Sequence, residues 1–151
     1  MEQRWWQRNA FWIIIGGALL IIDQTVKAVV IKQQPNIDLR LFRVVVVKNT
    51  GASFGMLGDA NALLIWVAII AIGLFLTYHD QLPALGTRWG FVASAGVMSN
   101  VFDRVIRGGV IDYVDLGWWP VFNLGDATIV IGVAIIGYAL IRKEQEPKQG
   151  R

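Results

Sequence analysis

Four long apolar segments constrain the fold of this chain more than any other feature of its sequence. They cover about residues 11–31, 62–78, 89–105 and 121–141. A helix that crosses a bilayer needs about 20 mostly apolar residues, and each segment reaches or approaches that length. The composition agrees, because 55% of the 151 residues are hydrophobic and only 17% are charged. We therefore predict an all-α membrane protein with four transmembrane helices.

The chain is expected to form one integral membrane domain, residues 1–151, because domains usually hold about 100–200 residues. The segment 89–105 is the least apolar of the four and is rich in glycine, alanine and serine. Small residues let membrane helices approach closely, so we expect this helix to be the most buried. The segment 11–31 is longer than the apolar part of a typical cleaved signal peptide, and no small-residue cleavage site follows it, which favours a permanent span.

Two extracytoplasmic loops are expected on one side of the membrane, at 32–61 and 106–120. The run Val44–Val47 and the later Gly51 predict a small β-rich region in the first loop, between the first and second helices. Four spans place both termini on the opposite side. Seven lysines and arginines lie on that side and six near the loops, a slight excess that favours cytoplasmic termini. Residues 143–151 are mostly polar and predict a disordered cytoplasmic tail.

Polar residues gather toward one face of the predicted membrane domain. The outgoing first and third segments carry them near their ends, the returning fourth segment carries them near its start, and the loops add two more. These residues are Asp23, Lys27, Asn49, Asn100, Arg104, Asp112, Asn123 and Asp126. A charged residue at the centre of a membrane costs about 2.5–3.5 kcal/mol, so such residues usually have a role. Their depth predicts a polar pocket near one leaflet, used for catalysis, transport or helix packing.

The spacing of these residues separates structural roles from chemical ones. Asp23 and Lys27 are four residues apart on one helix face, where they can form an ion pair, and we interpret this pair as structural. Asp103 is also interpreted as a structural ion-pair partner. Asp126, in contrast, has no cation within one turn of its own helix, so its carboxylate needs a partner from another element.

The available side chains limit the chemistry of this pocket. The chain has no cysteine, and its single histidine, His79, lies on the other side of the membrane, which excludes a thiolate nucleophile and a Ser-His-Asp triad. Metal binding by a carboxylate pair alone has weak support, and no basic run interleaved with aromatics indicates nucleic acid. Asp112 and Asp126 are candidates for two acids that share one proton. A small proton- or ion-coupled transporter and a non-catalytic scaffold remain alternatives.

Four short motifs, taken in order, resemble those of the lipoprotein signal peptidase (signal peptidase II) family. They are Asp23-Gln24-x-x-Lys27; Asn49-Thr50-Gly51-Ala52-Ser53-Phe54-Gly55; Asn100-x-x-Asp103-Arg104 followed by Gly109-Val110-Ile111-Asp112-Tyr113; and Phe122-Asn123-x-Gly125-Asp126. Each motif is short, but their order and the four-span layout are together specific over roughly residues 11–141.

The resemblance implies a membrane-embedded aspartic endopeptidase of the bacterial cytoplasmic (inner) membrane. Such an enzyme removes the signal peptide from diacylglyceryl-modified prolipoproteins by cutting before the lipid-modified cysteine, with its active site toward the outer leaflet. Asp112 and Asp126 would be the catalytic pair. The residues that hold the substrate and the pair would be Asn49, Asn100, Arg104 and Asn123. Asp23, Lys27 and Gly51 would support the structure near the site. The sequence indicates no metal, other cofactor or nucleic-acid partner, and we expect a monomer in contact with membrane lipids.

Overall fold

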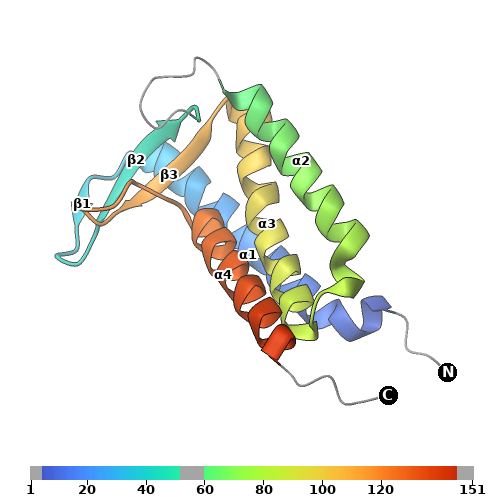
Figure 1. The fold of residues 1–151 in the computed structure, drawn as a ribbon. Coiled ribbons are helices and arrows are strands. Elements are labelled where there is room, and N and C mark those ends of the chain that lie inside the picture. The colour runs from blue at the N-terminus through green and yellow to red at the C-terminus, as the bar shows by residue number, and fades with distance from the viewer. Residues whose placement is uncertain (1–4, 52–59, 146–151) are drawn as a thin grey trace, which may run out of the picture.

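A computed structural model describes residues 5–51 and 60–145 of the chain. The described residues form four long helices, which are α1 (Trp5–Gln33), α2 (Asn61–Tyr78), α3 (Ala84–Arg107) and α4 (Leu124–Gln145). A short 3₁₀ helix, η1 (His79–Gln81), joins α2 to α3. Figure 1 shows the four long helices in a bundle, with a small sheet at the end away from the start of α1 and the end of α4.

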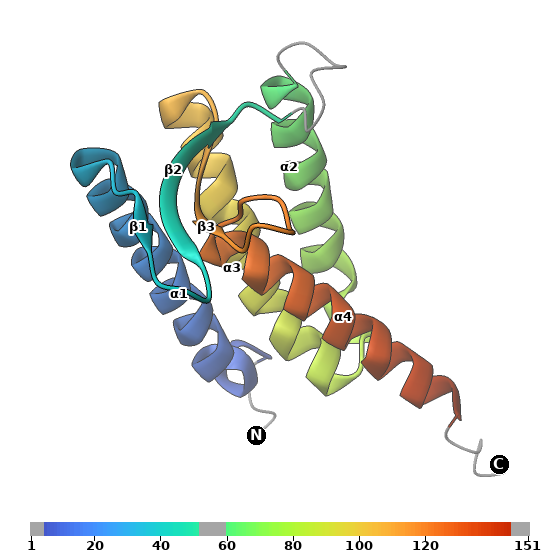
Figure 2. The same cartoon turned by 90° about the vertical axis from the view of Figure 1, so that its left-hand side faces the viewer.

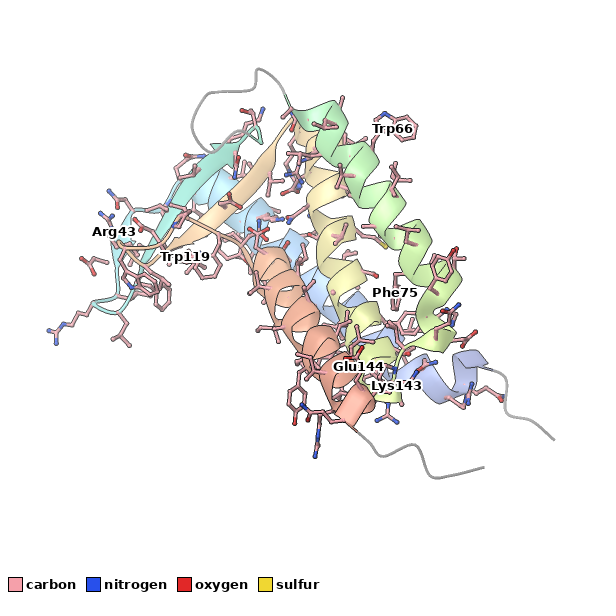
Figure 3. All side chains as sticks on the ribbon, viewed as in Figure 1. Arg43, Trp66, Phe75, Trp119, Lys143 and Glu144 are labelled. Atoms are coloured by element: carbon pink, nitrogen blue, oxygen red, sulfur yellow. The ribbon has the colours of Figure 1, made fainter. Side chains whose placement is uncertain are left out.

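Three helices in the described part of the chain are long and apolar enough to cross a membrane: Gln7–Gln33, Asn61–Gln81 and Leu124–Gln145. Their outer surfaces carry large exposed apolar side chains, such as Ile14, which is 69% exposed, and Val130, which is 65% exposed. Trp66 on α2 points away from the bundle (Figure 3). Extended apolar surfaces of this kind are suited to contact with membrane lipids.

The helix α3 is less apolar because it lies inside the bundle. It contacts α1, α2 and α4, and Figures 1 and 2 show it in the middle of the other three. Ten of its residues are buried, including the small residues Gly90, Ala93 and Gly96. A helix that faces protein on most sides does not need an apolar side chain at every position. The expectation that the third segment is the most buried is therefore confirmed.

Helix ends account for the differences from the predicted segments. The helix α3 starts after Pro83 and stops at Gly108, whose φ of 68° ends the helix, so it is longer than the predicted 89–105. The helix α4 begins at Leu124 rather than at residue 121 and continues to Gln145. The prediction of a disordered tail from residue 143 is thus wrong for residues 143–145, and the rest of that tail lies outside the described residues.

Small residues let α3 and α4 approach each other next to the predicted pocket. A Cβ atom added at Gly96 would collide with the Thr128 hydroxyl and the Gly125 carbonyl. The Thr128 hydroxyl donates a hydrogen bond to that same carbonyl at 2.7 Å, within α4. This close contact brings the first turn of α4 beside the polar end of α3.

The sheet has three antiparallel strands in the order β1 (Ile37–Asp38), β2 (Arg43–Asn49) and β3 (Val110–Asp115). The predicted β-rich region was confined to the first loop, and the structure corrects this, because β3 comes from the second loop, 106–120. The two apolar residues before Asp112, Val110 and Ile111, are buried and pair with β2. The register pairs Val47 with Asp112, which brings the end of β2 next to this acid.

Candidate active site

Amide side chains from three parts of the chain hold the carboxylates of Asp112 on β3 and Asp126 in the first turn of α4. Asn49 Nδ2 donates to Asp112 Oδ2 at 3.1 Å. Asn123 Nδ2 donates to Asp112 Oδ1 at 2.6 Å. Asn100 Nδ2, from α3, donates to Asp126 Oδ1 at 2.7 Å. The structure therefore brings both predicted acids and all three predicted asparagines into one hydrogen-bonded group.

Asn123 joins the two acids directly. Its backbone N–H donates to Asp126 Oδ2 at 3.1 Å, and its side-chain oxygen accepts the Asp126 N–H at 2.9 Å. This reciprocal pair is a capping box, which satisfies backbone donors at the start of a helix. Because the same side chain also donates to Asp112, the cap that starts α4 sets the position of Asp126 relative to Asp112.

The two acids differ in their surroundings. The Asp112 side chain is buried, and burial together with the negative charge of Asp126 raises its pKa to about 6, although the hydrogen bonds from Asn49 and Asn123 oppose the shift. Burial and a neighbouring carboxylate both disfavour the charged form of an acid. Asp112 therefore takes up a proton at a higher pH than an ordinary aspartic acid does.

The raised pKa of Asp112 makes stability depend on pH in a defined direction. The folded protein binds this proton more tightly than the unfolded chain, so the group's stabilising contribution is lost as pH rises from 3.8 through about 6. The variant Asp112→Asn cannot lose a proton. We expect the melting temperature of the variant, relative to that of the unmodified protein, to increase as the buffer changes from about pH 4.5 to about pH 7. A temperature difference that stays constant over this range, measured in detergent, would contradict the raised pKa.

Next to the acids lies a buried ion cluster, formed by Asp23, Lys27, Asp103 and Arg107. Lys27 Nζ lies 2.7 Å from Asp23 Oδ2 and 2.9 Å from Asp103 Oδ2, and all three side chains are at most 1% exposed. Arg107 pairs with the other oxygen of Asp103. The predicted Asp23–Lys27 ion pair is confirmed, and Asp103 pairs with Lys27 and Arg107. Two carboxylates and two cations balance, as burial requires.

The cluster is linked to the acids through α3. Lys27 Nζ also donates to Asn100 Oδ1 at 3.1 Å, while the nitrogen of the same amide donates to Asp126. The lysine therefore fixes which way round the Asn100 amide sits. Asn100 presents its nitrogen to the acid because its oxygen is occupied by the cation.

Arg104 and Gly51 lie at the edges of the group. Arg104 Nη1 donates to the backbone oxygen of Asn100 at 3.4 Å, and its buried Nε has no hydrogen-bond partner among the described residues. The Gly51 N–H donates to Asn49 Oδ1 at 2.9 Å, with φ of 99°, a conformation that favours glycine. This contact leaves Asn49 Nδ2 free to face Asp112. The rest of that motif, residues 52–59, lies outside the described residues.

Sequence reasoning missed several residues of this network, among them Ser99 and Tyr113. Ser99 donates to Asp23 Oδ2 at 2.6 Å, and the Tyr113 hydroxyl donates to Asp23 Oδ1 at 2.9 Å. Each directly adjoins a predicted residue, Asn100 or Asp112, and that adjacency is the signal that could have drawn attention to them. The described residues contain no group of three or more His, Cys, Asp or Glu side chains that could hold a metal ion.

Comparisons with known proteins agree with one another. The family model for signal peptidase (SPase) II matches residues 15–142. A lipoprotein signal peptidase of Vibrio cholerae serotype O1 is 34% identical over 148 residues, which cover 86% of each chain. The lipoprotein signal peptidase of Halothermothrix orenii is 32% identical over 139 residues, which cover 87% of this chain and 96% of the relative.

Two solved structures, both described as bacterial membrane enzymes, share the fold. One has a TM-score of 0.84 at 22% sequence identity and covers 94% of each chain. The other has a TM-score of 0.80 at 23% identity and covers 87% of this chain and 93% of its own. At these identities the likeness establishes the arrangement of helices and strands.

Proposed function

Since the chain belongs to the signal peptidase II family, we propose that Asp112 and Asp126 are the catalytic pair with which it cleaves its substrate. The protein is a membrane aspartic endopeptidase that processes prolipoproteins, and membership does not support the transporter alternative. The observation that carries the assignment of the pair is the link through Asn123, whose side chain donates to Asp112 and whose backbone donates to Asp126.

The proposed mechanism uses the difference between the two acids. Asp126 takes a proton from a water molecule as the water oxygen attacks the carbonyl carbon that precedes the lipid-modified cysteine. Asp112 gives its proton to the carbonyl oxygen. The C–N bond of the tetrahedral intermediate then breaks, Asp126 passes its proton to the departing amine nitrogen, and Asp112 recovers its proton as the new carboxyl group forms. Each acid ends in the state in which it began.

Asn49, Asn100 and Asn123 are proposed to keep the two carboxyl groups in this arrangement, because each donates to one of them. Arg104 is proposed to contact the substrate, since its buried Nε is a donor without a partner among the described residues. The Arg104 guanidinium, a buried cationic donor near two acids, suits a carbonyl or phosphate oxygen on the substrate. Asp23, Lys27 and Gly51 are proposed to support the structure next to the site.

We also propose that α3 is a fourth membrane span within one domain. Its 24 residues give a length of roughly 36 Å at about 1.5 Å per residue, which is enough to cross the hydrocarbon core. The packing of α1, α2 and α4 around it reduces its need for apolar residues. Arg8 and Arg88 lie near the starts of α1 and α3, and Arg142 and Lys143 lie in the last turn of α4, at the bundle end away from the sheet (Figure 1). Their positive charge favours cytoplasmic termini in the inner membrane and an active site toward the outer leaflet.

Cleavage of a lipid-modified precursor tests the proposed function. The purified protein, as a monomer in detergent, is incubated with a diacylglyceryl-modified prolipoprotein and, separately, with the same precursor lacking the lipid. We expect release of the signal peptide only from the lipid-modified form, with the new N-terminus at the modified cysteine when the product is analysed by mass spectrometry. No cleavage, or cleavage of the unmodified form alone, would contradict the proposal.

A further inference from the structure

The hydroxyl group of Tyr113 connects elements that carry the two acids. Tyr113 follows Asp112 on β3, and its side chain is 8% exposed. Its hydroxyl donates to Asp23 Oδ1 on α1 at 2.9 Å and accepts the backbone N–H of Leu124 at 3.1 Å. Leu124 is the first residue of α4, two positions before Asp126. One hydroxyl thus bridges the buried ion cluster, strand β3 and the start of α4.

The cluster that holds this hydroxyl is well suited to fix a position. Asp23 also accepts a hydrogen bond from Ser99 at 2.6 Å and pairs with the fully buried Lys27 at 2.7 Å. Lys27 in turn pairs with Asp103 on α3. Because a buried charge that loses its partner is costly, these contacts resist displacement. The Tyr113 hydroxyl is therefore held by a carboxylate that is itself held by α1 and α3.

The same cluster also binds β3 at Ile111, the residue before Asp112. The backbone N–H of Ile111 donates to Asp103 Oδ2 at 3.0 Å. The residues before and after Asp112 are thus both hydrogen-bonded to the cluster, one through its backbone and one through its side chain. Asp112 lies between two points that the cluster fixes.

The Leu124 N–H is one of the first donors of α4, which have no partner within their own helix. The capping box formed by Asn123 and Asp126 satisfies other donors of that turn, but both of its links to the site pass through a proposed catalytic acid. Backbone bonds join Phe122 to β3, yet they end before the helix begins. The bond from Leu124 to Tyr113 holds the helix itself without using either acid.

We infer that Tyr113 is a positioning residue, which holds the first turn of α4, and with it Asp126, in a fixed place relative to Asp112. This inference rests on the proposed function of the two acids. The contacts of the Tyr113 hydroxyl to Asp23 and Leu124 involve neither acid, so they do not change when a proton moves between the acids. They therefore keep the relative position of Asp112 and Asp126 constant through the reaction. A displacement of about 1 Å in such a site can lower a rate by about 100-fold.

The variant Tyr113→Phe removes the hydroxyl and keeps the ring. We expect kcat for the lipid-modified precursor, measured per mole of folded protein, to fall about tenfold or more, while KM changes less than about twofold. Hydrogen exchange in the first turn of α4 should become faster. Tyr78→Phe is the matched control, because Tyr78 is 51% exposed and lies at the end of α2, outside this network. A kcat for Tyr113→Phe equal to that of the control would overturn the inference, even if the yield of folded protein fell.

A second variant removes the other end of the same contact. Leu124→Pro lacks the N–H that donates to Tyr113, and proline is tolerated at the first position of a helix. If the two groups act through one bond, the double variant Tyr113→Phe/Leu124→Pro should have the same kcat as Leu124→Pro within about twofold. Fully multiplicative losses would overturn the inference.

The variant Asp126→Asn, measured in the same assay, separates the two proposals. An inactive Asp126→Asn beside a fully active Tyr113→Phe would overturn the positioning role alone. Full activity in both variants would overturn the proposed catalytic pair, and the positioning role with it.

Discussion

Replacing either Asp112 or Asp126 with asparagine is expected to abolish signal-peptide removal and leave a folded protein. An asparagine cannot carry the shared proton or take one from water, and the loss of an acid or base group lowers a rate by about 10²–10⁴-fold. Because the two acids are proposed to act on one water molecule, each single variant should lose nearly all the activity that both together lose. The measurement is kcat/KM with a lipid-modified precursor in detergent.

The side chains around the acids indicate that the asparagine variants will fold. At both positions an amide oxygen can accept one of the hydrogen bonds that the carboxylate accepts now, from Asn123 at Asp112 and from Asn100 at Asp126. Asp115→Asn is the matched control, since Asp115 lies on the same strand but pairs with Arg43 at 2.5 Å. The control should keep near-normal activity. Near-normal cleavage by Asp112→Asn or Asp126→Asn would refute the catalytic pair, and loss of activity in the control would add Asp115 to the site.

Much of this site could be predicted from the depth of each residue within its predicted membrane span. Counting residues along alternating predicted spans gathers Asp112, Asp126 and their asparagines at one end of the bundle, because the direction of each helix fixes where its polar end lies. The i, i+4 spacing of Asp23 and Lys27 predicts their ion pair, and helix geometry confirms it. These inferences need only local periods and the order of the segments.

The pairing of strands could not be predicted in the same way. The second loop contributes β3 because buried apolar residues beside Asp112 find partners on β2, and that contact joins positions more than 60 residues apart, such as Asn49 and Val110. No local pattern encodes such a register. The role of Tyr113 is hidden for the same reason, since its partners come from α1 and α4.

By hydropathy alone, α3 is not among the helices of the described residues that are apolar enough to cross a membrane. A helix needs apolar side chains only where it faces lipid, and α3 faces three other helices, so it can carry Ser99, Asn100 and Asp103 on its buried side. The low apolar content of this segment is therefore a consequence of its central position. Its small residues, such as Gly96, were the better signal, because they report the close helix contacts directly.

Replacing Lys27 with methionine is expected to remove most of the folded protein. Methionine nearly matches the length of lysine but carries no charge, so Asp23 and Asp103 would face each other with only Arg107 to balance them. Breaking a buried ion pair by removing one partner costs about 3–5 kcal/mol, which is a large part of the stability of a small domain. The yield of monodisperse protein and its apparent melting temperature in detergent measure this loss. Lys32→Met, at an exposed position of the same helix, is the control and should behave like the unmodified protein.

A second substitution tests whether the loss comes from unbalanced charge. In Lys27→Met/Asp23→Asn, Asp103 and Arg107 remain as one matched pair, so the double variant should be more stable than Lys27→Met alone. Whatever fraction of Lys27→Met folds should still cleave the precursor, at a reduced rate, because Lys27 contacts Asn100 and neither acid directly. A fully stable but inactive Lys27→Met would show that the lysine takes part in the chemistry. The buried ion cluster would then be part of the active site rather than a support for it. The balance of its charges would have to be explained by the reaction rather than by burial.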